Sequence, residues 1–181
     1  MKNFFDQYFN SLSRHIESYD YDDLVSFSEA IENIKSKRGK LLLFGNGGSA
    51  AIASHAAVDF SKTLNVRAMT CSESSLVTCL SNDYGYEEWI EKAIDYYSDA
   101  NDLIVIISSS GESENVIRGA VRAKELNLKL ITFSGFSPDN RLRKLGDIAF
   151  WVDSSVYNFI ENVHQSWLLS IVDFLSHKDT N

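Results

Sequence analysis

The sequence predicts an α/β fold in which helices cover a parallel β-sheet. Short apolar runs rich in β-branched residues alternate along the chain with longer segments of helical periodicity. The run at residues 103–107 is apolar at every position, which is typical of a parallel strand buried on both faces. Because parallel strands are joined by crossover helices, this alternation predicts an α/β sandwich.

Two helices are expected before the first strand, at residues 2–19 and from about residue 22 to residue 37. Gly39, just after the second, is a good helix stop. The first carries a largely aromatic stripe at three- and four-residue steps, namely Phe4, Phe5, Tyr8, Phe9, Leu12 and Ile16. This stripe leaves two interpretations open, ordinary core or a subunit interface. We expect a single domain, 1–181, with a helical extension at 1–38.

The first strand is expected at residues 40–44. The later elements follow in order: a helix at 50–64, a strand at 67–71, a short helix at 76–80, a loop at 82–86, a helix at 87–97, the strand at 103–107, a helix at 115–126, a strand at 128–133, a short helix at 141–145, a strand at 148–152 and a helix at 157–176.

Composition excludes several classes of protein. The formal net charge of -8 argues against non-specific binding to nucleic acid and to anionic membrane surfaces. No apolar run is long enough to span a bilayer, and the N-terminus has no signal-peptide pattern. Cys71 and Cys79 do not suggest a disulfide framework. We therefore expect a cytoplasmic protein.

A glycine-rich loop follows the first strand, with three glycines in residues 45–48 and Ser49 next. Free backbone N–H groups and the start of a helix together attract an anion. Gly45, Gly47 and Ala50 also fit G-x-G-x-x-A, a dinucleotide pattern. A dinucleotide needs only one such turn, and this chain has a second loop of the same kind, so no nucleotide cofactor is expected.

The second loop follows the strand at residues 103–107. Its hydroxyl groups are those of Ser108, Ser109, Ser110 and Ser113, and a helix begins directly after them. Four hydroxyls and the N–H groups of a helix start suit a single phosphate group. The alternative is a solvated flexible loop, which is less common between a buried strand and a helix.

Residue for residue, these loops resemble the sugar isomerase (SIS) domain, and most closely its bacterial phosphoheptose isomerases. The resemblance covers nearly the whole chain. The matching segments are residues 45–49, His55, residues 82–86, residues 108–113 and residues 160–164.

The resemblance implies a five-stranded parallel sheet and a homotetramer with sites between subunits. It places the substrate phosphate on Ser49, Ser108, Ser110 and Ser113, and the sugar on Asp83 and Ser109. We expect Asn46 and Gly47 of the glycine loop to contact the substrate as well.

Aldose–ketose isomerisation needs a base, an acid and stabilisation of negative charge on oxygen. His55 and Asp59 are one turn apart on one helix, and Glu161 and His164 are three residues apart on another. We expect Asp59, Glu161 and His164 to take part in catalysis. Two histidines and two carboxylates can also form a zinc site, for which we expect His55, Asp59 and Glu161.

Three positions depart from the family pattern. Asp59 stands where the family has Glu, Glu161 where it has Gln, and Leu169 where it has a second catalytic His. Two hypotheses follow. The chain is a phosphosugar isomerase acting on sedoheptulose 7-phosphate or a related sugar phosphate, or it is a non-catalytic SIS protein that binds a sugar phosphate or a protein partner.

Overall fold

A computed structural model describes the backbone of residues 1–180 and the side chains of residues 1–178. Five parallel strands form one sheet in the order β2-β1-β3-β4-β5, which confirms the predicted fold class. The strands are β1 (Lys40–Gly45), β2 (Arg67–Thr70), β3 (Leu103–Ile107), β4 (Lys129–Ser134) and β5 (Ile148–Trp151). Each strand lies close to its expected range.

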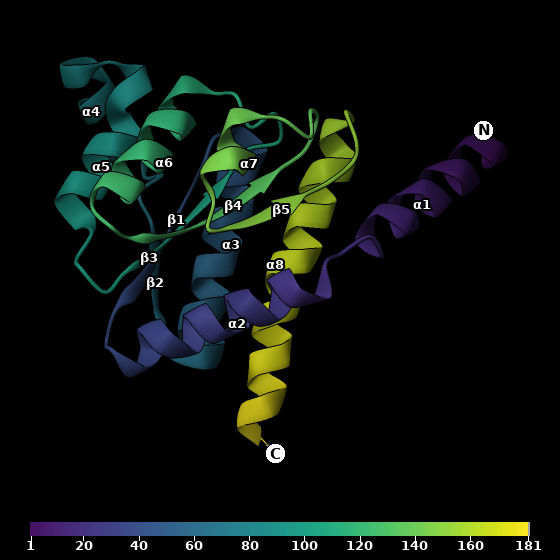
Figure 1. The fold of residues 1–181 in the computed structure, drawn as a ribbon. Helices are drawn as coiled ribbons and strands as arrows, with labels where there is room; N and C mark the ends of the chain where they lie inside the picture. Colours follow the sequence, from purple (N-terminus) through teal and green to yellow (C-terminus); the bar gives the residue numbers. More distant parts are fainter. Residues whose placement is uncertain (181) are drawn as a thin grey trace.

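Helices cover both faces of this sheet (Figure 1). One apolar core lies between the sheet and α2 (Tyr21–Ser36), α3 (Gly47–Leu64) and α8 (Tyr157–Thr180). The other lies under α4 (Ser74–Tyr84), α5 (Trp89–Tyr97), α6 (Glu114–Glu125) and α7 (Arg141–Leu145). Alternate residues of β1 enter the two cores, Leu41 and Leu43 the first, Leu42 and Phe44 the second. No helix of the described chain is long and apolar enough to cross a membrane.

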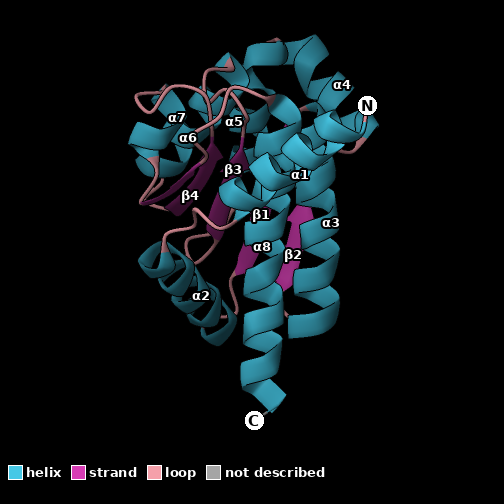
Figure 2. Cartoon of the chain, turned by 90° about the vertical axis from the view of Figure 1, so that its right-hand side faces the viewer, coloured by secondary structure: helices cyan, strands magenta, loops and turns pink. Residues whose placement is uncertain are grey.

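The two N-terminal helices differ in how they pack. The ring of Phe27 on α2 lies against Phe60, Phe133 and Phe150 in the first core. By contrast, α1 (Lys2–Ile16) has no buried residue and projects from the body of the molecule (Figure 1). Figure 2 shows α1 over the upper part of α8, with α3 beside α8. Trp167 of α8 holds the end of α1 by donating its indole N–H to the carbonyl of Ile16 at 2.8 Å.

Helix boundaries depart from expectation where capping groups decide them. The carboxylate of Glu73 accepts from the N–H groups of Ser75 and Leu76, so α4 begins at Ser74. It continues to Tyr84, so that residues 82–84, expected in a loop, form its last turn. Gly85 ends the helix at a φ of 101°, a conformation that favours glycine. The 3₁₀ turn η1 (Tyr86–Glu88) then leads into α5.

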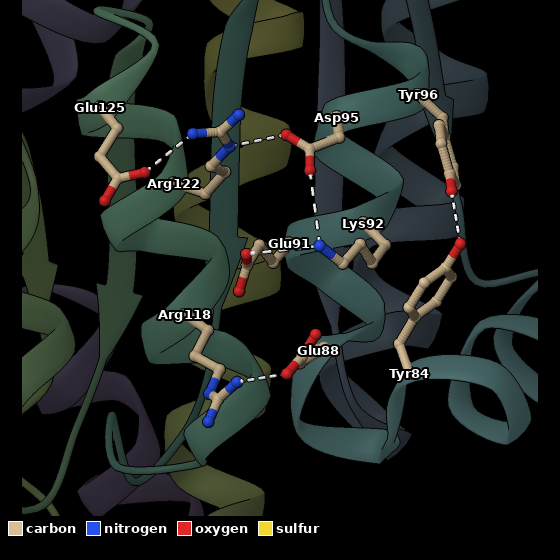
Figure 3. A network of polar contacts seen from close by, with 9 residues as sticks. All are labelled: Tyr84, Glu88, Glu91, Lys92, Asp95, Tyr96, Arg118, Arg122 and Glu125. Carbon is tan, nitrogen blue, oxygen red and sulfur yellow. Dashed lines mark hydrogen bonds and ion pairs between the residues drawn. The ribbon is translucent and has the colours of Figure 1, made fainter.

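Ion pairs brace α5 against α6 on the second face (Figure 3). Arg122 of α6 donates to Asp95 of α5 at 2.6 Å, and Arg118 donates to Glu88 at 2.8 Å. The hydroxyls of Tyr84 and Tyr96 meet at 2.9 Å and link the end of α4 to α5. These contacts join η1 and α5 to α6, and the end of α4 to α5.

Asp102 fastens the opposite, amino-terminal edge of the sheet. Its carboxylate is buried, accepts from the backbone N–H groups of Lys40 and Asp99 at 2.8 and 2.7 Å, and pairs with the Lys40 ammonium at 2.5 Å. Removing it leaves two part-buried backbone N–H groups and the Lys40 ammonium without this acceptor. We expect Asp102→Ala to lower the free energy of unfolding by about 3 kcal/mol in urea denaturation.

Asp99→Ala is the matched control, because that carboxylate pairs with the same lysine but is 82% exposed. Its urea midpoint should stay close to that of the wild type. Equal losses of stability in the two variants would contradict the claim that the Asp102 carboxylate stabilises this edge of the sheet.

Candidate functional site

The glycine loop and the serine loop lie side by side at the carboxyl edge of the sheet. Gly45 at the end of β1 pairs in register with Ile107 at the end of β3. The strand order reverses here, because β1 lies between β2 and β3 and the following helices α3 and α6 cover opposite faces. Open α/β sheets bind ligands at such a switch point.

The glycine loop brings the backbone close to its neighbours. A side chain at Gly45 would meet the backbone of Ser49 at 2.7 Å, so the turn into α3 requires a glycine. Gly47 opens α3 with a φ of 53°, and the side chain of Ser49 is buried in its first turn. A side chain at Gly48 would clash with the Glu161 carboxylate, which places that carboxylate over the loop.

The serine loop is folded tightly on itself. Gly111 donates its N–H to Ser108 Oγ at 3.2 Å, and Glu112 donates its N–H to Ser110 Oγ at 3.3 Å. Within the described chain, the buried hydroxyl of Ser109 has no hydrogen-bond partner. Ser113 precedes α6 without using its side chain as a cap. The hydroxyls of Ser109 and Ser113 therefore carry no structural hydrogen bond in the described chain.

A pair of side-chain amides joins the two loops. The sequence does not predict this pair. Asn46 Nδ2 donates to Asn115 Oδ1 at 3.1 Å, and Asn115 Nδ2 donates to Asn46 Oδ1 at 2.9 Å. Tyr86 donates its hydroxyl to the same Asn46 Oδ1 at 3.0 Å. Asn115 lies in the first turn of α6, so the pair holds the glycine loop against the helix that follows the serine loop. No local pattern signals contacts between residues so far apart in sequence.

Asp83 lies in the last turn of α4, three residues before Tyr86. It is exposed, and its carboxylate accepts from the amide of Asn82 at 2.9 Å and from the thiol of Cys79 at 3.8 Å, both on α4. The structure thus leaves the expected contact between Asp83 and a sugar as a hypothesis.

His55 and Asp59 form a pair on α3, facing α8. His55 Nε2 lies 3.3 Å from Asp59 Oδ2, and His55 Nδ1 lies 3.3 Å from the amide nitrogen of Gln165. Because an amide NH₂ can only donate, Nδ1 accepts and Nε2 carries the proton that is shared with Asp59. At 1.5 Å per residue, His55 and Asp59 lie about 9 and 15 Å along the helix from Ser49.

His164 lies in the first core, away from this pair. Its ring is fully buried, packs edge-on against Phe133 and hydrogen-bonds to the backbone carbonyl of Ser134 at 3.0 Å. Burial lowers its pKa from 6.5 to about 4, so the ring is neutral at pH 7. From the sequence, His164 is expected to take part in catalysis. In this structure its buried ring cannot touch a substrate.

The expected zinc ligands are not brought together within one chain. His55 and Asp59 are adjacent, but the Glu161 carboxylate lies at Gly48, in the first turn of α3. Among the described residues there is no group of three or more His, Cys, Asp or Glu side chains that can hold a metal ion. A zinc site needs four ligands, or three and a water molecule, so the residues of a single chain do not fit this metal.

Comparison with known proteins agrees with the geometry. A family model described as the SIS domain matches residues 3–135, well over half of the chain. The chain belongs to the SIS domain family. The match runs from α1 through the end of β4 and includes both loops and the His55–Asp59 pair. The resemblance inferred from the motifs is confirmed.

Phosphoheptose isomerases are among the most similar relatives. The probable phosphoheptose isomerase of Thermoplasma volcanium is 35% identical over 154 residues, which cover 81% of this chain and 78% of that protein. The phosphoheptose isomerase of Helicobacter pylori is 31% identical over 161 residues, covering 85% and 82%. The structure of phosphoheptose isomerase from Neisseria gonorrhoeae superposes with a TM-score of 0.86 at 26% identity, covering 95% and 96%.

The buried state of His164 gives stability a defined pH dependence. The unfolded chain binds a proton at this side chain near pH 6.5, whereas the folded chain does so only near pH 4. The unfolding free energy should therefore fall as pH drops from about 6.5 to about 4. In His164→Gln the slope should be smaller by up to about 1.4 kcal/mol per pH unit, measured by urea denaturation.

At pH 7.5 His164 is neutral in both the folded and the unfolded state. The difference in unfolding free energy between the wild type and His164→Gln at that pH therefore gives the cost of the substitution itself. If plots of unfolding free energy against pH for the two proteins run parallel between pH 7.5 and pH 4, His164 is not the group that causes the pH dependence.

Proposed function

We propose that this chain is a phosphosugar isomerase that interconverts the aldose and ketose forms of sedoheptulose 7-phosphate or a related sugar phosphate. The observation that carries the proposal is the pair of joined loops at the switch point of the sheet, in a chain whose relatives are named phosphoheptose isomerases. Leu169, which stands where the family has a catalytic histidine, makes a direct assay of turnover necessary.

The phosphate group would bind between Ser49 and the serine loop. The N–H groups at the start of α3, together with the hydroxyls of Ser108, Ser110 and Ser113, supply donors at one place. With a net charge of -8, the protein attracts an anion here through local backbone dipoles rather than its overall field. The unpartnered hydroxyl of Ser109 would donate to the sugar.

Proton transfer between C1 and C2 would use the His55–Asp59 pair. Asp59 is the base in this proposal, and His55 holds its carboxylate through the Nε2 proton. Glu161, whose carboxylate lies over the glycine loop, would be the second acid–base group. His164 takes no part, because it is sealed in the core.

The proposed homotetramer would bring the two ends of the site together. Asp59 lies about 15 Å along α3 from Ser49, farther than one sugar phosphate comfortably spans, so a second copy would supply one end. Exposed apolar surface supports this assembly: Phe4, Phe5 and Phe9 are 54–63% exposed, and a cavity of about 410 Å³ between α2 and α8 is lined by Trp167 and other residues.

Zinc enters this proposal only at such a subunit interface. Since one chain does not assemble the ligand set, no step of the reaction is assigned to the metal. The free thiols of Cys71 and Cys79 support the expectation of a reducing cytoplasm.

The proposal is tested by incubating the purified protein with sedoheptulose 7-phosphate, with and without added Zn²⁺, and measuring the aldose formed. Turnover that is lost in Asp59→Asn is the expected result. Zinc content and oligomeric state are measured on the same preparation. No turnover, together with stabilisation by the sugar phosphate, would support the non-catalytic hypothesis instead.

The serine loop makes a separate prediction about affinity. Ser110→Ala removes a hydroxyl next to the proposed phosphate and should raise the Kd for sedoheptulose 7-phosphate by about tenfold or more, as expected for a hydrogen bond to a charged group. Isothermal titration calorimetry measures this. Ser137→Ala is the control, because that serine lies in the turn after β4 outside the serine loop. An unchanged Kd in Ser110→Ala would refute the phosphate assignment.

A further inference from the structure

The serine loop lies between the glycine loop and the segment that joins β4 to α7, because β3 is flanked by β1 and β4 in the sheet. On the β4 side, Gly135 donates its backbone N–H to the carbonyl of Ser109 at 2.9 Å. Leu142 donates its N–H to the carbonyl of Gly111 at 3.0 Å. A carbonyl oxygen repels an anion, and these two bonds engage such oxygens on the side away from the glycine loop.

The hydroxyls of the serine loop are oriented by its own turn. Ser108 Oγ accepts the N–H of Gly111, and Ser110 Oγ accepts the N–H of Glu112. A hydroxyl has one proton and two lone pairs, so both hydroxyls keep their protons for donation to an anion. This arrangement depends on Gly111, whose φ of 67° lies in the left-handed region that favours glycine.

Asn140, the residue just before α7, is 1% exposed and hydrogen-bonded through both ends of its amide. Its Nδ2 group donates to Ser134 Oγ at 3.1 Å and to the carbonyls of Gly135 and Ser137 at 3.2 and 2.7 Å. Its Oδ1 accepts the N–H of Arg143 at 2.9 Å, which caps α7. Contacts at both ends give this side chain a single orientation.

The fixed amide of Asn140 lies directly against Gly111. A side chain at Gly111 would clash with the Asn140 amide, so Asn140 fills the space in which that side chain would lie. The hydrogen bonds of Asn140 keep it from moving away. Because protein interiors are close-packed, an empty space at this point would let the turn at Gly111 shift.

We infer that Asn140 is a positioning residue for the phosphate group. It touches no ligand itself; it holds the turn at Gly111, and that turn aims the hydroxyls of Ser108 and Ser110. The inference rests on the proposed function, since it takes the serine loop to bind a phosphate. It adds a residue from the segment after β4 to a site whose donors come from the loops after β1 and β3.

Two ligands test this role. Asn140→Ala should raise the Kd for inorganic phosphate and the Kd for sedoheptulose 7-phosphate by about the same factor, roughly tenfold, because both offer a phosphate to the same donors. Isothermal titration calorimetry at about 15 °C, where proteins are usually near their maximum stability, measures both constants. Urea denaturation at the same temperature verifies that the variant is folded.

Asp102→Ala is the matched control for lost stability. Asp102 is also a buried polar residue with several hydrogen bonds, but it lies at the opposite edge of the sheet. Its variant should keep both Kd values within about twofold of the wild type, because distant sites act independently. A loss of affinity equal to that of Asn140→Ala would show that lowered stability, and not the position of the loop, is the cause.

Gly111→Ala tests the same contact from the other side, and does so even if Asn140→Ala does not fold. The added methyl group would push against the Asn140 amide and should raise both Kd values. In the Asn140→Ala background the amide is absent, so Gly111→Ala should raise them by a smaller factor, as expected for residues in contact. Asn127→Ala controls for backbone strain, because Asn127 has a similar φ of 57° just after α6, and its Kd values should stay unchanged.

Unchanged Kd values in Asn140→Ala or in Gly111→Ala would overturn the inference, and so would a wild type that binds neither ligand. Neither measurement depends on turnover. Binding that responds as described, without isomerisation, would overturn the proposed function alone. Isomerisation by a protein whose phosphate affinity is unaffected by Asn140→Ala would overturn the inference alone.

Discussion

The parallel pairing of β1 and β3 is the constraint on which the rest of the site depends. Parallel strands deliver their carboxyl ends to one edge, and the register that opposes Gly45 to Ile107 starts both loops at the same level. The two helices that follow must leave toward opposite faces, because each face needs its own cover. Helix starts and free N–H groups therefore converge at one point of an otherwise acidic molecule.

The amide pair of Asn46 and Asn115 fixes the two loops relative to each other. Two loops that merely begin side by side can still move independently, whereas reciprocal hydrogen bonds and the Tyr86 hydroxyl tie them to each other and to η1. The donors then keep their positions before a ligand arrives, which reduces the ordering that binding requires. Order at this end contrasts with the proposed reacting end, where the side chain of His55 is about half exposed.

One chain therefore has ordered donors at the proposed phosphate end and an open arrangement at the proposed reacting end. The Glu161 carboxylate and the His55–Asp59 pair lie at different positions along α3. The apolar surface of α1 also remains uncovered. The proposed homotetramer accounts for both features, because a neighbouring copy would cover the apolar helices and complete the proposed reacting end.

The sequence by itself determined the fold class, the order of the strands and helices along the chain and the two loops that are proposed to bind an anion. These follow from periodicity and from glycine, which act over a few residues. Only the tertiary structure decided that His164 is sealed beneath Ser134, that residues 82–84 extend α4, and that Asn115 and Tyr86 hold Asn46. Burial and pairing between distant residues depend on how the layers pack, and no local pattern records that packing.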